Sequence, residues 1–245
     1  MKIIGLSRVR NESEIMLDTL NHMSEFCDSI YIYDDASTDN TVEICESHPL
    51  VKEVIKGDVW DLNRERAEYQ NREAILKLAR KKEELNLDDW FIYMDADERI
   101  EFNFNNLSNI SNECDAIKMR LFDFYITKED VNKNYVEREW MGPEYRDILF
   151  MFKNGNAIGY SIPDQREVFL KPNTRVKQIG FVKHYGKSIS IKQWEDTCEY
   201  YSKNFPKYSK KWELRKGKAI HTVSDFGRKL ITWQSKNDIT KIIKL

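Results

Sequence analysis

The sequence is poor in the features that mark several common protein classes. Its 245 residues include only four cysteines, which are scattered and never form a CxxC pair. We therefore expect reduced thiols rather than a disulfide framework, and no zinc site. No apolar run reaches about 18 residues, so the sequence predicts no membrane-spanning segment. The N-terminus, MKIIGLSRVRNE, becomes charged too early for a signal peptide, which favours a cytoplasmic protein.

The chain also lacks a strong excess of charge of either sign. It carries 39 Lys and Arg against 41 Asp and Glu, a formal net charge of −2 at pH 7. This balance argues against nucleic acid as a partner, because binding to the phosphate backbone depends on a positive surface. With 41% hydrophobic residues, a chain of this length can bury a substantial core.

Glycine-rich phosphate-binding motifs are missing as well. No GxGxxG follows the first apolar run and no GxxxxGK[ST] occurs, which excludes dinucleotide-binding and P-loop proteins. A sugar-phosphate nucleotidyltransferase would need a glycine-rich loop after its first strand, but the segment SRVRNE contains no glycine. A phosphatase with a DxDx[TV] nucleophile motif would need Thr or Val at the position of Arg99.

The sequence does contain an alternation of apolar runs and amphipathic segments. Over the first hundred residues this alternation predicts an α/β fold, with a parallel sheet and helices on its faces. Shorter runs in the second half predict an antiparallel or mixed extension, and a helical pattern returns from Ser190 onward. The expected strands are 2–7, 29–35, 51–57, 89–98, 115–126, 147–154 and 156–162, and the expected helices are 15–26, 40–47 and 64–85.

Two of the expected strands end in acidic clusters, in YIYDDASTDNT at residues 31–41 and in WFIYMDADERI at residues 90–100. Ligands of open parallel sheets bind in the crevice at the carboxyl ends of the strands. Alternation along an extended segment would point Asp95 and Asp97 the same way. Two carboxylates on one side suit a hard divalent ion such as Mg²⁺ or Mn²⁺. A turn or helix cap is the simpler alternative, and it stays open for Asp39.

These segments resemble the family 2 glycosyltransferases of the GT-A fold. The resemblance rests on RVRNE, YIYDDASTDNT, QNREAILKLA and DWFIYMDADE, which cover about residues 3–100 in the expected order. RDILFMF, DQREVF and FVKHYG are similar more loosely, and Arg166 stands where many relatives have His before Glu. The resemblance implies a GT-A type Rossmann-like sheet with flanking helices, a mixed or antiparallel second half and a C-terminal helical tail.

The resemblance also implies an activity and its residues. It implies a hexosyltransferase with a nucleotide-sugar donor, a UDP-sugar being favoured, a Mn²⁺ or Mg²⁺ cofactor, and a saccharide or lipid-linked saccharide acceptor. Such an enzyme fits polysaccharide, lipopolysaccharide or glycoconjugate biosynthesis. Asp35 would accept a hydrogen bond from uracil, Asp95 would lie near the ribose or the metal, and Asp97 would ligate the metal. Arg8 and Arg72 would contact base or phosphate, with a solvated helix arginine as the alternative for Arg72.

The second half of the chain supplies the remaining candidates. His184, in FVKHYG, would complete the metal site as a late histidine does in some GT-A enzymes, with a structural histidine as the alternative. An inverting transfer needs a base across the sugar from the leaving diphosphate. Glu167 is our preferred base and Asp164 the second choice. A retaining mechanism stays open.

The resemblance and the helical pattern after Ser190 predict two parts of the chain, a GT-A domain at 1–189 and a helical extension at 190–245. Residues 1–100 would bind the nucleotide-sugar and residues 101–189 the acceptor. The tail mixes aromatic side chains with lysines, which would suit peripheral contact with a membrane. Packing of the tail on the catalytic domain and a homodimer interface are the alternatives. A degenerate GT-A module that binds nucleotide-sugar without turnover is the alternative for the whole chain.

Overall fold

The computed structural model describes residues 1–61, 63–161, 166–237 and 243–244. They form the predicted α/β fold. The strands are β1 (Ile3–Val9), β2 (Ser29–Asp34), β3 (Val51–Lys56), β4 (Trp90–Tyr93), β5 (Glu98–Glu101), β6 (Ala116–Phe124), β7 (Trp140–Lys153), β8 (Ala157–Gly159), β9 (Phe169–Leu170), β10 (Val176–His184), β11 (Ile231–Thr232) and β12 (Ile243–Lys244). The α-helices are α1 (Met16–Ser24), α2 (Thr41–Ser47), α3 (Arg64–Lys82), α4 (Leu107–Glu113), α5 (Ile191–Asn204) and α6 (Ser209–Glu213), and the 3₁₀ turns are η1 (Phe104–Asn106), η2 (Tyr135–Glu137), η3 (Asn154–Asn156) and η4 (Trp233–Asn237).

The main sheet has the strand order β3-β2-β1-β4-β7-β6-β10-β5, with β11 and β12 paired to β7. β1 runs parallel to β2 and to β4, and β3 runs parallel to β2. The sheet becomes mixed at β7, which pairs with β4 antiparallel. This topology confirms the expected parallel first half with a mixed extension. β8 and β9 form a separate two-stranded sheet.

The chain forms two compact units. The first contains residues 1–119 and 148–180, and the second contains residues 120–147 and 181–245. The expected boundary between residues 189 and 190 lies inside the second unit, and it stays a prediction about domain organisation.

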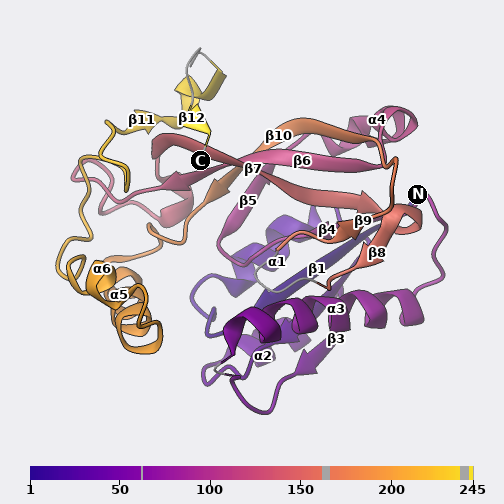
Figure 1. Ribbon diagram of the computed structural model, residues 1–245, viewed down its shortest axis with the longest axis horizontal. Coiled ribbons are helices and arrows are strands. Elements are labelled where there is room, and N and C mark those ends of the chain that lie inside the picture. The colour runs from indigo at the N-terminus through magenta and orange to yellow at the C-terminus, as the bar shows by residue number, and fades with distance from the viewer. Residues whose placement is uncertain (62, 162–165, 238–242, 245) are drawn as a thin grey trace. The chain divides into compact units, whose positions relative to one another are not determined.

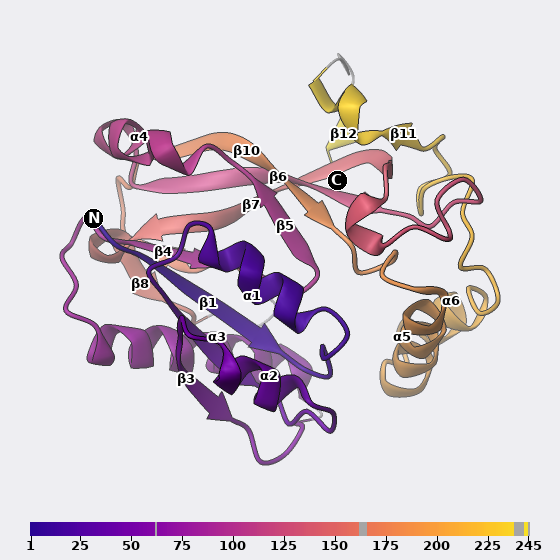
Figure 2. The same cartoon turned by 180° about the vertical axis from the view of Figure 1, so that it is seen from behind.

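In the first unit, helices cover both faces of the parallel strands. Figure 1 shows α3 on the near side of β1, and Figure 2, seen from behind, shows α1 and α2 on the near side. α3 packs on β1 and β2 through Ile75, Leu76 and Ala79, which join Leu6 and Phe91 in one fully buried cluster. Each large apolar side chain buried this way stabilises the fold by roughly 1.5–3 kcal/mol.

α1 lies close to the sheet because β1 carries a glycine beneath it. A Cβ atom at Gly5 would lie 2.6 Å from Met23 Cε and 3.0 Å from Cys27 Sγ, so a larger residue would force these groups to move. The helix buries Met16, Leu20 and Met23 at helical spacing, whereas Leu17 is 55% exposed.

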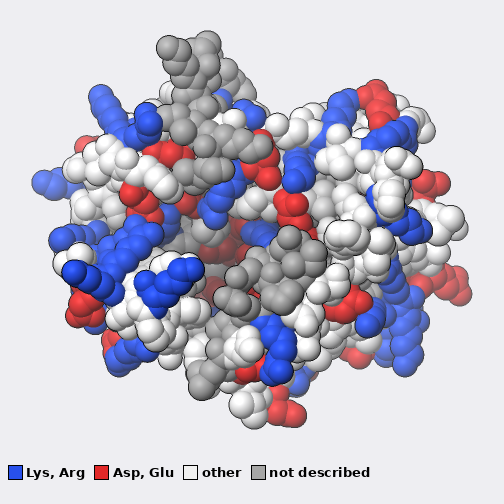
Figure 3. Space-filling view, viewed as in Figure 1, with Lys and Arg blue, Asp and Glu red and all other residues white. Residues whose placement is uncertain are grey.

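In the second unit, α5 buries Trp194 and Cys198. α6 packs on α5, with the rings of Trp194 and Trp212 6.1 Å apart. Figure 3 shows Lys and Arg side chains gathered at the left of the view, over these two helices. No α-helix follows α6 in the described residues, and Gly217 and Gly227 there take left-handed backbone angles, with φ of 70° and 74°. Such angles end a regular helix.

Within the part of the chain that the structure describes, no helix is both long and apolar enough to cross a membrane. Residues 238–242 and 245 of the C-terminal tail lie outside the described residues. Peripheral membrane contact and a homodimer interface through this tail stay predictions.

Candidate functional site

The first acidic cluster follows β2 and contains a buried carboxylate. Asp35 is 3% exposed, and its Oδ1 accepts a hydrogen bond of 3.2 Å from Asn71 Nδ2 on α3. Arg8 Nη1 on β1 donates to Asp35 Oδ2 at 3.3 Å, and Arg8 Nη2 donates to Glu68 on α3 at 3.2 Å. A strand and a helix therefore hold one carboxylate between them. Sequence reasoning named Arg8 and Asp35 but missed Asn71, which stands inside the QNREAILKLA segment.

The other aspartates of this cluster bind the backbone. Asp34 Oδ2 accepts a hydrogen bond of 2.9 Å from the Ser37 N–H. Asp39 Oδ1 accepts one of 3.0 Å from the Thr41 N–H at the start of α2, and Asp39 Oδ2 accepts one of 3.2 Å from the Ser13 N–H. Burial alone would raise the pKa of Asp39, but the hydrogen bonds from Thr41 and Ser13 lower it. Asp39 thus stabilises the turn that leads into α2, the simpler alternative left open by the sequence.

The second acidic cluster follows β4, which ends at Tyr93. Ala96 and Asp97 form a turn, so the expected strand does not extend to them and strand alternation does not apply to Asp95 and Asp97. Asp95 Oδ1 accepts a hydrogen bond of 3.1 Å from the Tyr93 hydroxyl. Glu98 is 0% exposed, and its Oε2 accepts a hydrogen bond of 2.8 Å from the Asp95 N–H. The turn therefore brings the buried Glu98 carboxylate to the backbone of Asp95.

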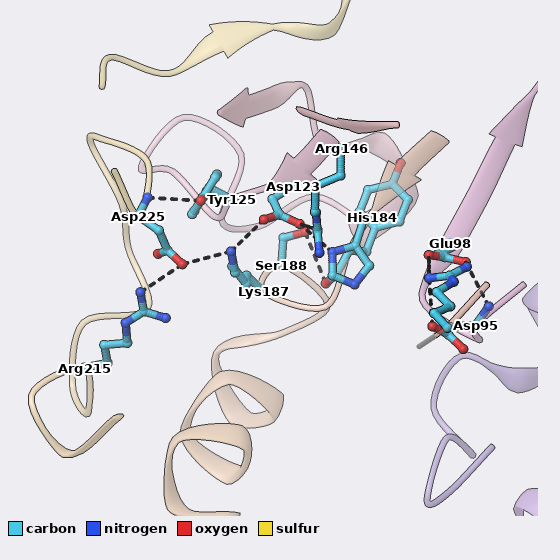
Figure 4. Close-up of polar contacts among 12 residues, drawn as sticks. Asp95, Glu98, Asp123, Tyr125, Arg146, His184, Lys187, Ser188, Arg215 and Asp225 are labelled. Atoms are coloured by element: carbon cyan, nitrogen blue, oxygen red, sulfur yellow. Dashed lines mark hydrogen bonds and ion pairs between the residues drawn. The ribbon is translucent and has the colours of Figure 1, made fainter. Parts of the chain in front are cut away.

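Arg166 joins Asp95 to Glu98, whose carboxylates lie close together in Figure 4. Arg166 Nη1 lies 2.9 Å from Asp95 Oδ2 and 2.5 Å from Glu98 Oε1, and Nη2 lies 2.5 Å from Glu98 Oε2. The guanidinium carbon lies 5.6 Å from the ring centroid of Tyr93 and 4.8 Å from that of Phe150. Burial alone would lower the pKa of Arg166, but the two carboxylates hold it well above its ordinary value.

Three arginines act on Asp95. Burial alone would raise the pKa of this carboxyl, but Arg166, Arg72 and Arg8 bring it below its ordinary value. Arg72, on α3, is 5% exposed, and its guanidinium carbon lies 5.2 Å from the ring centroid of Tyr93. Its Nε atom has no hydrogen-bond partner among the described residues. Arg72 is therefore not the solvated helix arginine that the sequence left as an alternative.

The carboxylates here have the right chemistry for a hard cation, but they do not fit one as they are placed. Glu12 is a further acid that the charges of this cluster reach. Burial is the largest cause that raises the pKa of its carboxyl well above the ordinary value, and the charges of Asp97 and Asp95 add to it. Both oxygens of Asp95, however, already accept hydrogen bonds, from Tyr93 and from Arg166. No group of three or more His, Cys, Asp or Glu side chains in the described ranges is arranged to hold a metal ion.

Glu167, the preferred base, has structural contacts in the first unit. Its Oε1 accepts a hydrogen bond of 2.8 Å from the Leu149 N–H on β7, and its Oε2 lies 3.1 Å from Lys118 Nζ on β6. Its catalytic role stays a prediction. Asp164, the second choice, lies outside the described residues.

His184 belongs to a charge cluster of the second unit (Figure 4). Its Nδ1 lies 2.6 Å from Asp123 Oδ1, to which Arg146 Nη2 also donates at 2.5 Å, and Lys187 Nζ donates to Asp123 Oδ2 at 2.8 Å. Burial alone would raise the pKa of Asp123, but Lys187, His184 and Arg146 hold it well below its ordinary value. Because Nδ1 is engaged, a metal ion would have to bind His184 at Nε2. The metal role of His184 stays a prediction.

The cluster continues from Lys187 into the segment after α6. Lys187 Nζ lies 2.9 Å from Asp225 Oδ2, and Arg215 Nη2 lies 2.8 Å from the same oxygen. The Asp225 N–H donates a hydrogen bond of 3.1 Å to the Tyr125 hydroxyl (Figure 4). These contacts fix an irregular segment to β6, which explains how it keeps its place without regular secondary structure.

The fold of this chain is only weakly similar to those of two solved structures. HddC from Yersinia pseudotuberculosis has 10% sequence identity and a TM-score of 0.44, with 82% of this chain and 100% of that chain covered. Mannosyl-3-phosphoglycerate synthase from Rubrobacter xylanophilus has 17% identity and a TM-score of 0.33, with 54% of this chain and 42% of that chain covered. At these scores neither likeness carries a functional conclusion.

Sequence comparison is more informative. Uncharacterized proteins of Mycobacterium bovis and Mycobacterium tuberculosis are each 26% identical to this chain over 164 residues, which is 64% of this chain and 35% of theirs. The chain thus spans about a third of the length of these relatives. The model of the family described as glycosyl transferase family 2 matches residues 9–165, more than half of the sequence. The chain therefore belongs to glycosyl transferase family 2.

Proposed function

We propose that the protein transfers a sugar from a nucleotide-sugar, with a UDP-sugar as the favoured donor, to a hydroxyl group of a saccharide or lipid-linked saccharide. The observation that supports this most is that three arginines gather at the acidic strand ends: Arg8 donates to Asp35 at 3.3 Å, Arg166 donates to Asp95 at 2.9 Å, and the guanidinium carbon of the buried Arg72 lies 5.2 Å from the ring centroid of Tyr93. Guanidinium groups suit a diphosphate, because their positive charge and planar set of N–H donors match phosphate oxygens. The same positive charge would stabilise the diphosphate as it leaves the sugar.

Asp35 is the residue we propose for base recognition. Uracil offers an N–H donor, and a carboxylate can accept several hydrogen bonds at once. Asp35 accepts hydrogen bonds from Arg8 and Asn71. Because Asp35 is buried and held from both sides, it would meet the base without first losing conformational freedom.

The proposed transfer inverts the sugar. The bond between the sugar carbon and the diphosphate oxygen breaks while the acceptor oxygen bonds to the same carbon. The acceptor proton passes to a carboxylate on the opposite side of the sugar, for which we propose Glu167 with Asp164 as the alternative. A retaining transfer is the alternative for the whole step.

Metal dependence is a separate part of the proposal. Asp95 and Asp97 would hold Mn²⁺ or Mg²⁺ only if Asp95 were released from Arg166, and a bound ion would neutralise the charge of the diphosphate. The roles proposed for Asp35 and the arginines do not depend on this ion.

A thermal-shift panel of UDP, GDP, CDP and UDP-sugars tests the donor. We expect UDP compounds to raise the melting temperature most, because a ligand stabilises the native state to which it binds. Arg72→Gln, once circular dichroism shows that it folds, should lose most of this shift. Arg175→Gln removes the same charge from an exposed pair with Asp115 and should keep the shift. A stronger response to GDP or CDP, or no response to any nucleotide, would refute the donor assignment.

Turnover distinguishes an enzyme from a binding module. We expect slow release of UDP from at least one UDP-sugar and faster release when a suitable saccharide acceptor is added. Tight UDP-sugar binding with no release under any acceptor would favour the degenerate module instead.

A further inference from the structure

We propose that residues 207–218, which include α6 and are called the basic segment below, bind the protein to the surface of a membrane rich in anionic lipids. The lysines of the segment contact the lipid headgroups, and Leu214 enters the boundary between headgroups and acyl chains. The proposal goes beyond the proposed sugar transfer and does not depend on it.

The charge of the chain is divided unequally between its two units. The second unit carries 20 Lys and Arg against 13 Asp and Glu, whereas the first carries 19 against 28. The nearly neutral total of −2 therefore hides a second unit with a formal charge of +7. A protein unit with such an excess attracts anionic partners, most strongly where its cations are densest.

The cations are dense in the basic segment, which has six Lys and Arg and a single acidic residue. Two of the six are paired, Arg215 with Asp225 at 2.8 Å and Lys216 with Glu213 at 2.9 Å. Within the described residues no carboxylate pairs with the other four, which are Lys207, Lys210, Lys211 and Lys218. Four positive charges are therefore available to an anionic surface.

The acids of the neighbouring helix do not cancel this charge. α5 contributes three acidic residues, of which Asp196 pairs with Lys192 and Glu199 pairs with Lys203. With every acid counted, residues 191–218 carry eight Lys and Arg against four Asp and Glu. The surface over α5 and α6 therefore stays positive, as the gathered Lys and Arg side chains in Figure 3 show.

The helical geometry of α6 turns two of these lysines away from α5. Trp212 faces α5, where its ring stacks on that of Tyr201 with 4.7 Å between the centroids. Lys210, Lys211 and Leu214 lie about 100° to 160° from Trp212 around the helix axis. Leu214 is 62% exposed. The outer side of α6 thus combines cations with an exposed aliphatic side chain, as helices that lie in a membrane interface do.

An anionic membrane fits this combination better than nucleic acid does. Both would attract the lysines over a Debye length of about 10 Å. Leu214 gains free energy only where it leaves water for an apolar layer, and acyl chains provide such a layer beneath the lipid headgroups. A nucleic acid offers phosphates to the lysines but no layer of this kind.

Sedimentation of the full chain with lipid vesicles tests the proposal. Vesicles of phosphatidylcholine and phosphatidylglycerol in equal parts should bind it at least about tenfold more tightly than phosphatidylcholine alone does. Added salt should weaken this binding because it screens the attraction. A triple variant with Lys207→Gln, Lys210→Gln and Lys211→Gln should bind the anionic vesicles about tenfold or more weakly than wild type. No binding of wild type to the anionic vesicles would refute the proposal.

A matched control removes three exposed lysines from the first unit, with Lys52→Gln, Lys81→Gln and Lys171→Gln. It changes the total charge by the same amount and should bind the vesicles as wild type does. None of the substituted lysines has a carboxylate partner in the described residues, so both triple variants should fold, which circular dichroism checks. Equal losses of affinity in the two variants would overturn the assignment to the basic segment.

Leu214→Ser distinguishes a lipid surface from other polyanions. It should weaken binding to the anionic vesicles by about threefold or more, because an apolar side chain no longer leaves water. It should leave any binding to single-stranded RNA unchanged. Unchanged vesicle binding by this variant, or tighter binding of wild type to RNA than to the vesicles, would overturn the assignment to a membrane.

Discussion

The Nδ1 atom of His184 lies 2.6 Å from Oδ1 of Asp123, and this pair belongs to the charge cluster of the second unit. Despite burial, the neighbouring cations hold the pKa of Asp123 well below its ordinary value of 3.8. A carboxyl group with a lowered pKa in the folded state stabilises the protein above its unfolded pKa, and this stability is lost as the pH falls through the folded pKa. Asp123 should therefore contribute in full above about pH 4.

Asp123→Asn should lower the free energy of unfolding by about 3 kcal/mol near neutral pH, because it leaves buried cations without their counter-ion. Urea denaturation measures this loss. The difference from wild type should shrink as the pH falls below the ordinary value of 3.8. Asp196→Asn, which breaks an exposed pair with Lys192, should change stability by no more than about 0.5 kcal/mol. An Asp123→Asn loss that does not vary with pH would contradict this electrostatic account.

His22 should make stability depend on pH in a different window. Its Nε2 accepts a hydrogen bond of 2.9 Å from the Ile100 N–H, and burial, followed by the charge of Arg99, lowers its pKa from 6.5 to about 4. Between these values the unfolded chain binds a proton that the folded chain does not. Stability should therefore fall as the pH drops through this window, by about 3 kcal/mol at most.

His22→Gln keeps an acceptor for the Ile100 N–H but cannot titrate in this range. Urea denaturation of wild type and variant from about pH 7 to pH 4 compares the two slopes. The variant should lose less stability than wild type on acidification. Equal slopes would show that His22 does not control this dependence.

Asp35→Ala should weaken UDP binding by about 1–3 kcal/mol, the effect of losing a hydrogen bond to a charged group. Calorimetry measures it directly. Asp58→Ala removes an exposed carboxylate from the same unit and should leave UDP affinity unchanged. Unaltered binding by Asp35→Ala would remove Asp35 from base recognition.

Glu167→Gln should reduce turnover by roughly 10²–10⁴-fold, the usual range for loss of a general base, with donor binding nearly unchanged. Glutamine can still accept the hydrogen bond from the Leu149 N–H, so the fold should persist. Normal turnover by Glu167→Gln with an inactive Asp164→Asn would move the role to Asp164. If both variants stay active, the inverting mechanism is wrong.

The parallel half of the fold was predictable because apolar runs and amphipathic segments alternate there with little interruption. β7 was predicted only in part. It begins at Trp140, well before the expected start at residue 147. Its early residues include Gly142 and Pro143, which interrupt any apolar run. Its charged residues have partners that are distant in sequence: Arg146 pairs with Asp123, and Asp147 pairs with Arg120. Hydrophobic periodicity detects burial against apolar neighbours and does not detect a strand whose side chains are paired as ions.

The same limit applies to the candidate site. The motifs drew attention to Arg8, Asp35 and Asp95 because each stands in a short local pattern. Arg166 reaches Glu98 across 68 positions of sequence. No local pattern predicts such a pair, although the departure from His at this position marked Arg166 as unusual.

β4 has only four residues, all of them buried, and it is paired with β1 on one side and β7 on the other. Amide protons in a doubly paired strand exchange with solvent only when the surrounding sheet opens. Asp95 follows this strand by two residues, so its backbone is anchored to a part of the chain that we expect to exchange slowly. A substitution that loosens β4, such as Phe91→Ala, should therefore raise amide exchange near Asp95 and weaken donor binding together, although Phe91 is fully buried in the core.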